Sequence, residues 1–397
     1  MHNIKKIIYC GIAFLLCSSH GLFAQDNMGK VLGEIEANNT TLVALKQQIE
    51  VQKTGSRTGI YLPNPEVEFN YLWGSPSDLG DRKDLNIMQS FDFPTAYYYK
   101  RQIADGKASQ ADLQYAAQRK SILLQARGIC INLVYRNALK SELDSRLAHA
   151  QSIARAYQAK YDKGEANILE QNKAQLNLLN AQKEVENNDI EHTALLAELA
   201  RMNGGKAISL TDAAYQTYPL ASDFDQWYAT AEINNPALQH LSQEVEISHR
   251  QEQLNKAMSL PKFSAGYRSE RVLGTTFQGI GAGISIPLWE NKNTVKHAKA
   301  QTLALQNTQT DAKMQFYNSL KTQYTRAQGL QRMAADYRRV LQTVNSSDLL
   351  QKALDKGQIS FIEYVMEQAL YYDAVNRVLE VERDQQHAVA ELRQWEN

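Results

Sequence analysis

The sequence predicts a mainly α-helical chain with a small β part, built from two copies of one unit. First, the segment that begins at Asn38 returns at Asn234, a shift of 196 residues, and after one indel the shift becomes 193. Second, the 397 residues include only 8 Pro and 20 Gly, which permits very long helices. Third, each copy holds two short segments of alternating polarity, which predict strands. We therefore expect long coiled-coil hairpins and four strands per chain.

The period is far longer than the 20 to 50 residues or so of a solenoid repeat, so it indicates a duplicated half-protein. The longer shift aligns Pro65 with Pro261, and the shorter one aligns Gly164 with Gly357. This internal two-fold sequence repeat divides the chain into a first repeat, an equatorial connecting segment and a second repeat, which we place at 25–203, 204–223 and 224–397.

Residues 1–24 are predicted to be a secretory signal peptide. Lys5 and Lys6 precede an apolar run from 7 to 17, and small residues follow as far as Ala24. We expect cleavage after Ala24, and lipid attachment at Cys17 is the alternative. The remaining chain then keeps only Cys130, so an internal disulfide framework is excluded and packing must hold the fold.

The charge balance argues against a nucleic-acid partner. The chain has 43 basic and 43 acidic residues, and no basic stripe stands out. After residue 24 the sequence has no run of about 20 apolar residues, the length that a membrane helix needs. Any membrane crossing would therefore have to use strands.

The helices of the two repeats have matching start and stop signals. Asn39 and Asn235 are predicted N-caps, the second followed by Pro236, and their helices run to about 57 and 258. Each repeat then has a long helix, about 100 Å in length, and a helix that returns alongside it. These elements are placed at 94–162 and 167–203 in the first repeat and at 288–355 and 360–396 in the second.

The turns between these long helices also match. Gly164 and Gly357 supply the left-handed residue that ends a helix, and Asn167 and Ser360 are placed to cap the helix that follows. This structural role accounts fully for both glycines.

Four strands are predicted at 65–73, 85–93, 261–269 and 277–287. One face of each is apolar and the other is polar or small, which is typical of a barrel with lipid outside and water inside. A soluble hairpin with one face on a core is the alternative. The residues expected to face the water-filled lumen are Glu66, Glu68, Asn70, Asp92, Lys262 and Arg268.

No catalytic or metal-binding constellation is present in the sequence. The histidines lack Cys or carboxylate neighbours at ligand spacing, so we expect neither a metal site nor an enzyme. The glycines from Gly279 to Gly283 fall at every second position and lead to a proline, unlike a nucleotide-binding loop that opens into a helix. A barrel strand with a narrow inner face explains them better, and no cofactor is expected.

These features together resemble the TolC-type outer-membrane efflux protein family over about residues 27–396. The marks that carry the resemblance are the segment Asn235-Pro236-Ala237-Leu238, the strand ends Phe93-Pro94 and Ile286-Pro287, and the turns Tyr161-Asp162-Lys163-Gly164 and Leu354-Asp355-Lys356-Gly357. The short chain and brief loops are most similar to the heavy-metal exporter branch, of the CzcC and CusC kind. Branch membership does not establish a substrate, and no metal-binding motif supports one.

The resemblance implies a homotrimer with a twelve-stranded β-barrel in the outer membrane and an α-helical tunnel in the periplasm. Four strands cannot close a barrel, whereas three chains supply twelve. It also implies an exit duct for solutes, metal ions or drugs, delivered by an inner-membrane pump and a periplasmic adaptor. The hairpin turns that would meet the adaptor are Lys163, Gly164, Glu165, Lys356, Gly357 and Gln358.

The family closes the periplasmic end of its tunnel with side-chain links and acidic rings. Asp348 and Asp355 lie seven residues apart and share a helix face, and Arg155 is equivalent to Asp348 at the shift of 193. We expect these three residues to form a gate, and solvated outer positions are the alternative.

Two other classes compete with the duct. A structural coiled-coil envelope protein needs no amphipathic strands. A periplasmic adaptor usually has one helical hairpin flanked by β-domains, whereas two hairpins are predicted here.

Overall fold

A computed structural model describes residues 27–344 and 347–396, without the side chains of 347 and 348. The predicted signal peptide and the alternative at Cys17 lie outside the described residues. The elements in chain order are α1 (Asn27–Asn38), α2 (Thr40–Ser56), β1 (Glu66–Trp73), η1 (Ser77–Leu79), β2 (Asp81–Phe91), α3 (Pro94–Asp162), α4 (Ile168–Met202), α5 (Phe224–Ile233), α6 (Pro236–Met258), β3 (Lys262–Val272), β4 (Thr275–Ser285), α7 (Thr294–Thr343), α8 (Ser347–Asp355) and α9 (Phe361–Arg393).

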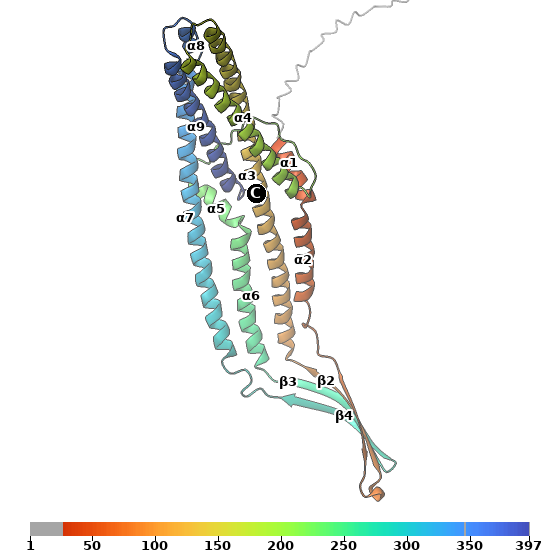
Figure 1. The fold of residues 1–397 in the computed structure, drawn as a ribbon. Coiled ribbons are helices and arrows are strands. Elements are labelled where there is room, and N and C mark those ends of the chain that lie inside the picture. The colour runs from red at the N-terminus through yellow and green to blue at the C-terminus, as the bar shows by residue number, and fades with distance from the viewer. Residues whose placement is uncertain (1–26, 345–346, 397) are drawn as a thin grey trace, which may run out of the picture.

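The molecule is an elongated helical bundle with the strands at one end and the two hairpin turns at the other (Figure 1). The helix α3 runs nearly the whole length of the bundle. It packs against α6 toward the strands and against α4 toward the turns, with α1, α2 and α9 also in contact. None of the helices in the described ranges is long and apolar enough to span a bilayer.

Two similar apolar clusters hold the middle of the bundle. The first joins α1, α3 and α4, and its most deeply buried members include Ile35, Leu133 and Leu199. The second joins α5, α7 and α9 through Phe224 and Ala327, among others. Each cluster thus packs the short leading helix of one half onto the long helices of that half. The duplication itself stays a prediction from the sequence.

The helix α1 was missing from the sequence-based prediction. Its buried residues Val31, Leu32 and Ile35 recur at helical spacing, so a signal was available. In the structure α1 ends where α2 begins, because Asn39 between them is extended and caps α2. The Asn39 side chain accepts from Leu42 N–H at 3.0 Å and donates to the carbonyl of Met202 at 2.8 Å.

The second long helix differs from the single rod expected over 288–355. In the structure α7 begins at Thr294, and α7 and α8 are separate helices. Asn293 has φ 66°, which no α-helix tolerates, and the Asn291 amide donates to the carbonyl of Met258 at 2.6 Å. The chain from 287 to 293 is therefore a turn tied to the end of α6, and the helix starts only after it.

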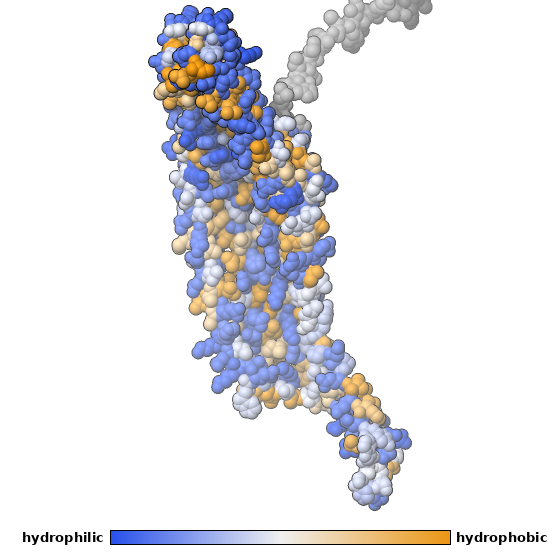
Figure 2. Space-filling model, viewed as in Figure 1, coloured by the Kyte–Doolittle hydropathy of each residue, from blue (hydrophilic) through white to orange (hydrophobic). Residues whose placement is uncertain are grey.

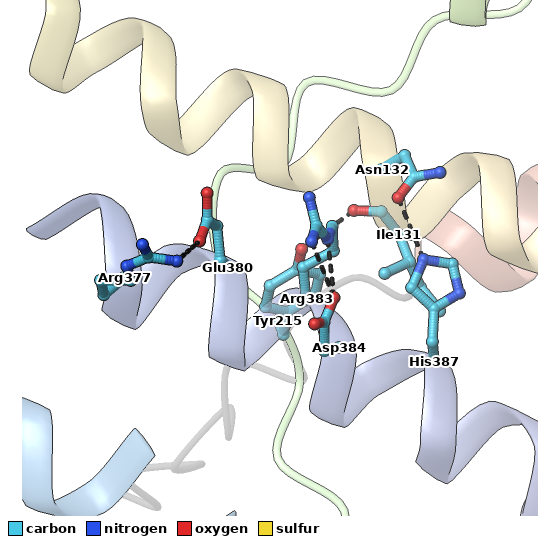
Figure 3. A network of polar contacts seen from close by, with 8 residues as sticks. All are labelled: Ile131, Asn132, Tyr215, Arg377, Glu380, Arg383, Asp384 and His387. Carbon is cyan, nitrogen blue, oxygen red and sulfur yellow. Dashed lines mark hydrogen bonds and ion pairs between the residues drawn. The ribbon is translucent and has the colours of Figure 1, made fainter. Parts of the chain in front are cut away.

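The equatorial segment 204–223 contacts both halves, since besides its bonds to α3 the carbonyl of Ala221 accepts from the Tyr324 hydroxyl of α7 at 2.5 Å. The Asn137 amide of α3 donates to the carbonyls of Leu210 and Asp212, both at 2.9 Å. The Tyr215 hydroxyl donates to the carbonyl of Ile131 at 2.9 Å, as Figure 3 shows. The bonds from Asn137 satisfy two carbonyls of the segment that no helix or strand pairs.

The same region links α9 to α3. A ring nitrogen of His387 lies 3.0 Å from Asn132 Oδ1, next to the Arg383 and Asp384 pair (Figure 3). The guanidinium of Arg383 also stands 4.8 Å from the ring centroid of Tyr135. Polar contacts therefore join the last helix to the first long helix at mid-height.

Replacing Asn39 with Ala tests its double role. The variant loses the N-cap of α2 and the bond to Met202, so we expect a loss of about 1–2 kcal/mol in the free energy of unfolding. Asn172→Ala, at an exposed position of α4, is the control and should change that free energy by less than about 0.5 kcal/mol. Denaturant titration of both purified variants measures the difference, and equal effects would contradict the assignment.

Candidate functional site

The strands form one antiparallel sheet in the order β1-β2-β3-β4. Residues directly opposite each other in such a sheet point to the same face. Glu68 lies opposite Asn86, which lies opposite Arg268, which lies opposite Gly279. This row runs across all four strands and contains only polar or small residues.

The register places five of the six predicted lumen residues on this polar face. They are Glu66, Glu68, Asn70, Lys262 and Arg268. The sixth was predicted wrongly to lie on the second strand, because β2 ends at Phe91. Asp92 instead joins the strand to α3: its carboxylate lies 2.8 Å from Lys100 Nζ, and its N–H donates to the Tyr97 hydroxyl at 2.9 Å.

The opposite face of the sheet is apolar and bare. The row Ile87, Tyr267 and Ile280 crosses three strands. Ile280 is 96% exposed, and on β1 Val67 is 67% and Phe69 63% exposed. A soluble hairpin packed on a core would bury these side chains, so the chain alone does not supply the surface that covers them.

Apolar side chains also gather at the far end of the bundle. Figure 2 shows them near the hairpin turns and where the strands leave the bundle, and it shows hydrophobic and hydrophilic residues mixed along the bundle between. At the turn end the exposed members include Leu169, Ile362 and Met366.

The two hairpin turns have the same backbone geometry. Gly164 has φ 74° and Gly357 has φ 67°. The N–H of Glu165 donates to the carbonyl of Lys160, and that of Gln358 donates to the carbonyl of Ala353, both at 2.8 Å. The N–H of Gly164 also donates to the carbonyl of Tyr161, and that of Gly357 to the carbonyl of Leu354, which completes a Schellman motif at both turns.

Capping boxes start the helices that follow the turns. The Asn167 side chain accepts from Glu170 N–H at 3.0 Å, and the Ser360 side chain accepts from Glu363 N–H at 3.3 Å. Each glutamate reaches back to the N–H of its capping residue. All six predicted docking residues, Lys163, Gly164, Glu165, Lys356, Gly357 and Gln358, are exposed on these turns.

The tips of the two hairpins pack against each other. Ile153 and Tyr157 of α3 share a buried cluster with Leu354 of α8 and with Phe361 and Tyr364 of α9. The rings of Tyr157 and Phe361 stand 4.8 Å apart between centroids. The two turns are therefore presented together at one end of the molecule (Figure 1).

A matching chain of side-chain hydrogen bonds runs along each hairpin. In the first, Gln171 donates to Gln158 at 2.7 Å, and Gln158 donates to Asp162 at 2.9 Å. In the second, Tyr364 donates to Gln351 at 3.1 Å, and Gln351 donates to Asp355 at 3.0 Å. Asp162 thus has the same environment as Asp355, and sequence reasoning missed it although the shift of 193 relates the two.

The structure describes the side chains of two of the three predicted gate residues, Arg155 and Asp355. Arg155 is exposed, and its Nε donates to the carbonyl of Gln151 at 3.3 Å. Asp355 is exposed and held by Gln351. Asp348 belongs to α8, but its side chain lies outside the described residues. Within one chain, no described acidic residue forms an ion pair with Arg155.

Neither the sheet nor the turns hold a group of metal ligands. Among the described residues no three His, Cys, Asp or Glu side chains are grouped so that they could bind a metal ion. Cys130 is buried in the bundle, and burial raises the pKa of its thiol to about 12. That thiol stays protonated at neutral pH and is a poor nucleophile.

Comparison with known proteins identifies the fold. No protein-family model and no curated protein matches the sequence. Among solved structures, CusC aligns with a TM-score of 0.79 at 11% identity, covering 94% of this chain and 92% of that one. VceC, an outer membrane protein of Vibrio cholerae, gives 0.72 at 13% identity, covering 93% and 94%. The CmeC outer membrane channel of Campylobacter jejuni gives 0.71 at 15% identity, covering 93% and 85%.

The chain has the TolC-like fold. The four-stranded sheet and the long hairpins belong to one continuous chain. The coverage of both partners is nearly complete in each comparison, so the fold includes the strands and the turns alike. The predicted mainly α-helical chain with long hairpins and a four-stranded sheet is confirmed, whereas the internal repeat and the trimeric barrel stay predictions.

Proposed function

We propose that this protein is the outer-membrane exit duct of a tripartite efflux system. Three copies would form a twelve-stranded barrel in the outer membrane, and their hairpins would form a tunnel in the periplasm. An inner-membrane pump and a periplasmic adaptor would deliver the solutes, metal ions or drugs, and the duct itself would be passive.

The observation that carries this proposal is the sheet with one bare apolar face and one polar face. Strands of 11 residues, such as β3 and β4, rise about 35 Å and would cover about 25 Å when tilted as in membrane barrels. That height matches the apolar band of outer-membrane barrels. Lipid would then cover Val67, Phe69 and Ile280, and water would contact Glu68 and Arg268.

The other two classes fit the structure less well. A structural coiled-coil protein does not need a sheet, so that class leaves the exposed apolar face of this sheet unexplained. An adaptor usually has one hairpin, whereas α3 with α4 and α8 with α9 make two hairpins whose turns lie together. The proposed duct uses both the sheet and the paired turns.

Labelling of neighbouring strand positions tests the barrel. Glu68 and Phe69 are adjacent on β1 and point to opposite faces. In a Cys130→Ser background, Glu68→Cys in outer membranes should react with a charged, water-soluble thiol reagent on the order of a hundredfold faster than Phe69→Cys, since apolar surroundings suppress the thiolate. Rates measured on intact membranes decide this, and equal rates would contradict a lipid-facing Phe69.

Docking of an adaptor at the turns predicts that bulky side chains placed there block export. The double variant Gly164→Trp with Gly357→Trp should abolish export and leave trimer yield intact. A Cβ at either position meets nothing within 4 Å. The substitution therefore lowers the free energy of unfolding only through the strain of a positive φ, by about 1–2 kcal/mol per site. Gly59→Trp is the matched control, because Gly59 has φ 70° and open space but lies between α2 and β1. Cell survival under a transported toxicant, with the trimer quantified on gels, measures both effects.

Normal export by the double variant would contradict docking at the turns. Loss of export in Gly59→Trp as well would show that backbone strain from replacing any glycine of positive φ is sufficient to abolish export.

The gate prediction concerns charge at the turn end. In the proposed trimer, Asp348 would pair with Arg155 of a neighbouring helix and, with Asp355, form acidic rings. Asp348→Arg should then raise the open probability in planar bilayers, since it repels Arg155, while Asp311→Arg, at an exposed position of α7, should not. Unchanged conductance and cation selectivity in both Asp348→Ala and Asp355→Ala would place these residues on the outer surface.

A further inference from the structure

A polar cavity lies between the two hairpins, some distance below their tips. Its volume is about 340 Å³, and it is bounded by α3, α4 and α9. The residues that decide its chemistry are Arg146, Glu184, Gln368 and Asp373. All the residues that line the cavity here belong to one chain.

Arg146 is a buried charge without a charged partner. Its side chain is 6% exposed. One terminal nitrogen donates to the Tyr372 carbonyl at 3.3 Å and to Asn376 Oδ1 at 2.9 Å, and the guanidinium stacks 4.4 Å from the Tyr372 ring centroid. The Nε atom has no hydrogen-bond partner, and no described acidic residue forms a salt bridge with the guanidinium.

Burial lowers the pKa of Arg146, and the carboxylates of Glu184 and Glu142 offset this only in part. An arginine stays protonated in proteins, so the group remains a cation. A buried cation is costly unless it is paired with an opposite charge. The protein itself supplies only neutral acceptors to this guanidinium at short range.

Gln368 is the second unsatisfied group in the same cavity. It is 4% exposed, and neither its amide nitrogen nor its amide oxygen has a partner. Buried polar groups in folded proteins nearly always have one. Water could satisfy the amide, but water does not neutralise the charge of Arg146.

We propose that this cavity binds a small monovalent anion, chloride or a short carboxylate such as acetate, between Arg146 and Gln368. The N–H groups of both side chains would donate to it. The carboxylates of Glu184 and Asp373 line the same cavity and would repel a sulfate or phosphate more strongly than an ion of single charge. The bound ion would neutralise Arg146 where α9 packs on α3 and so tie the two hairpins together.

Bromide in place of chloride tests the site directly. Crystals of the purified full chain grown in bromide should show an anomalous peak within hydrogen-bond distance of Arg146. Arg146→Met should lose that peak. The matched control is Arg339→Met, because Arg339 is the equivalent residue 193 positions later, exposed and paired with Asp336 at 2.7 Å; it should keep the peak.

Thermal unfolding gives a second measurement. At constant ionic strength, saturating chloride in place of gluconate should raise the unfolding midpoint by about 2–3 °C in the wild type and in Arg339→Met. A parallel series with acetate in place of chloride shows whether a carboxylate also binds. Gln368→Leu, which removes the unsatisfied amide without removing the charge, should reduce this shift and keeps the test available if Arg146→Met fails to fold.

Three results would overturn the proposal. They are the absence of a bromide peak in the wild type, an undiminished chloride shift in Gln368→Leu or Arg146→Met, and a stabilisation by sulfate that Arg146→Met reduces more than it reduces the stabilisation by chloride. None of these bears on whether the protein exports solutes, so the anion site and the proposed duct fail independently.

Discussion

The length of α3 is the constraint on which the rest of the fold depends. A helix of 69 residues rises about 100 Å and has no stable form in water without neighbours along it. Its return helix α4 has 35 residues and reaches only part of the way, and α6 from the other half covers the part toward the strands. Each half of the chain therefore completes the packing of the other, and neither hairpin would be stable as a rod by itself.

Local chemistry made the turns and strands predictable. Schellman glycines, capping boxes and period-two alternation are recognised from a few adjacent residues, so Gly164, Gly357 and all four strand regions could be predicted from the sequence. The ends of a strand were harder to predict where pairing with a neighbouring strand decides them. The strand β2 begins at Asp81, four residues before the expected start, because its polar end pairs with β3 and Arg82 lies 3.3 Å from Glu270.

The features that sequence could not supply lie between elements from different halves. Arg146 occurs in a long polar helix and looks like any solvated arginine, since nothing nearby in the chain indicates that α9 will cover it. Gln368 is equally ordinary in its own helix. Only the packing of α9 on α3 buries both. In the same way, Asn293 broke the expected long helix through a left-handed backbone that its sequence neighbours do not reveal.

The open edges of the sheet have a consequence for biogenesis. β1 and β4 are the outer strands of the sheet within the chain, and each leaves a row of backbone donors and acceptors unpaired. Soluble proteins protect such edges with charges, prolines or bulges, but β4, with the sequence TTFQGIGAGIS, has none of the charged or proline residues that do so. Before assembly this strand is a template for wrong pairing and aggregation. In the proposed trimer, β4 of one copy would pair with β1 of the next, so both edges would be covered only when the copies assemble.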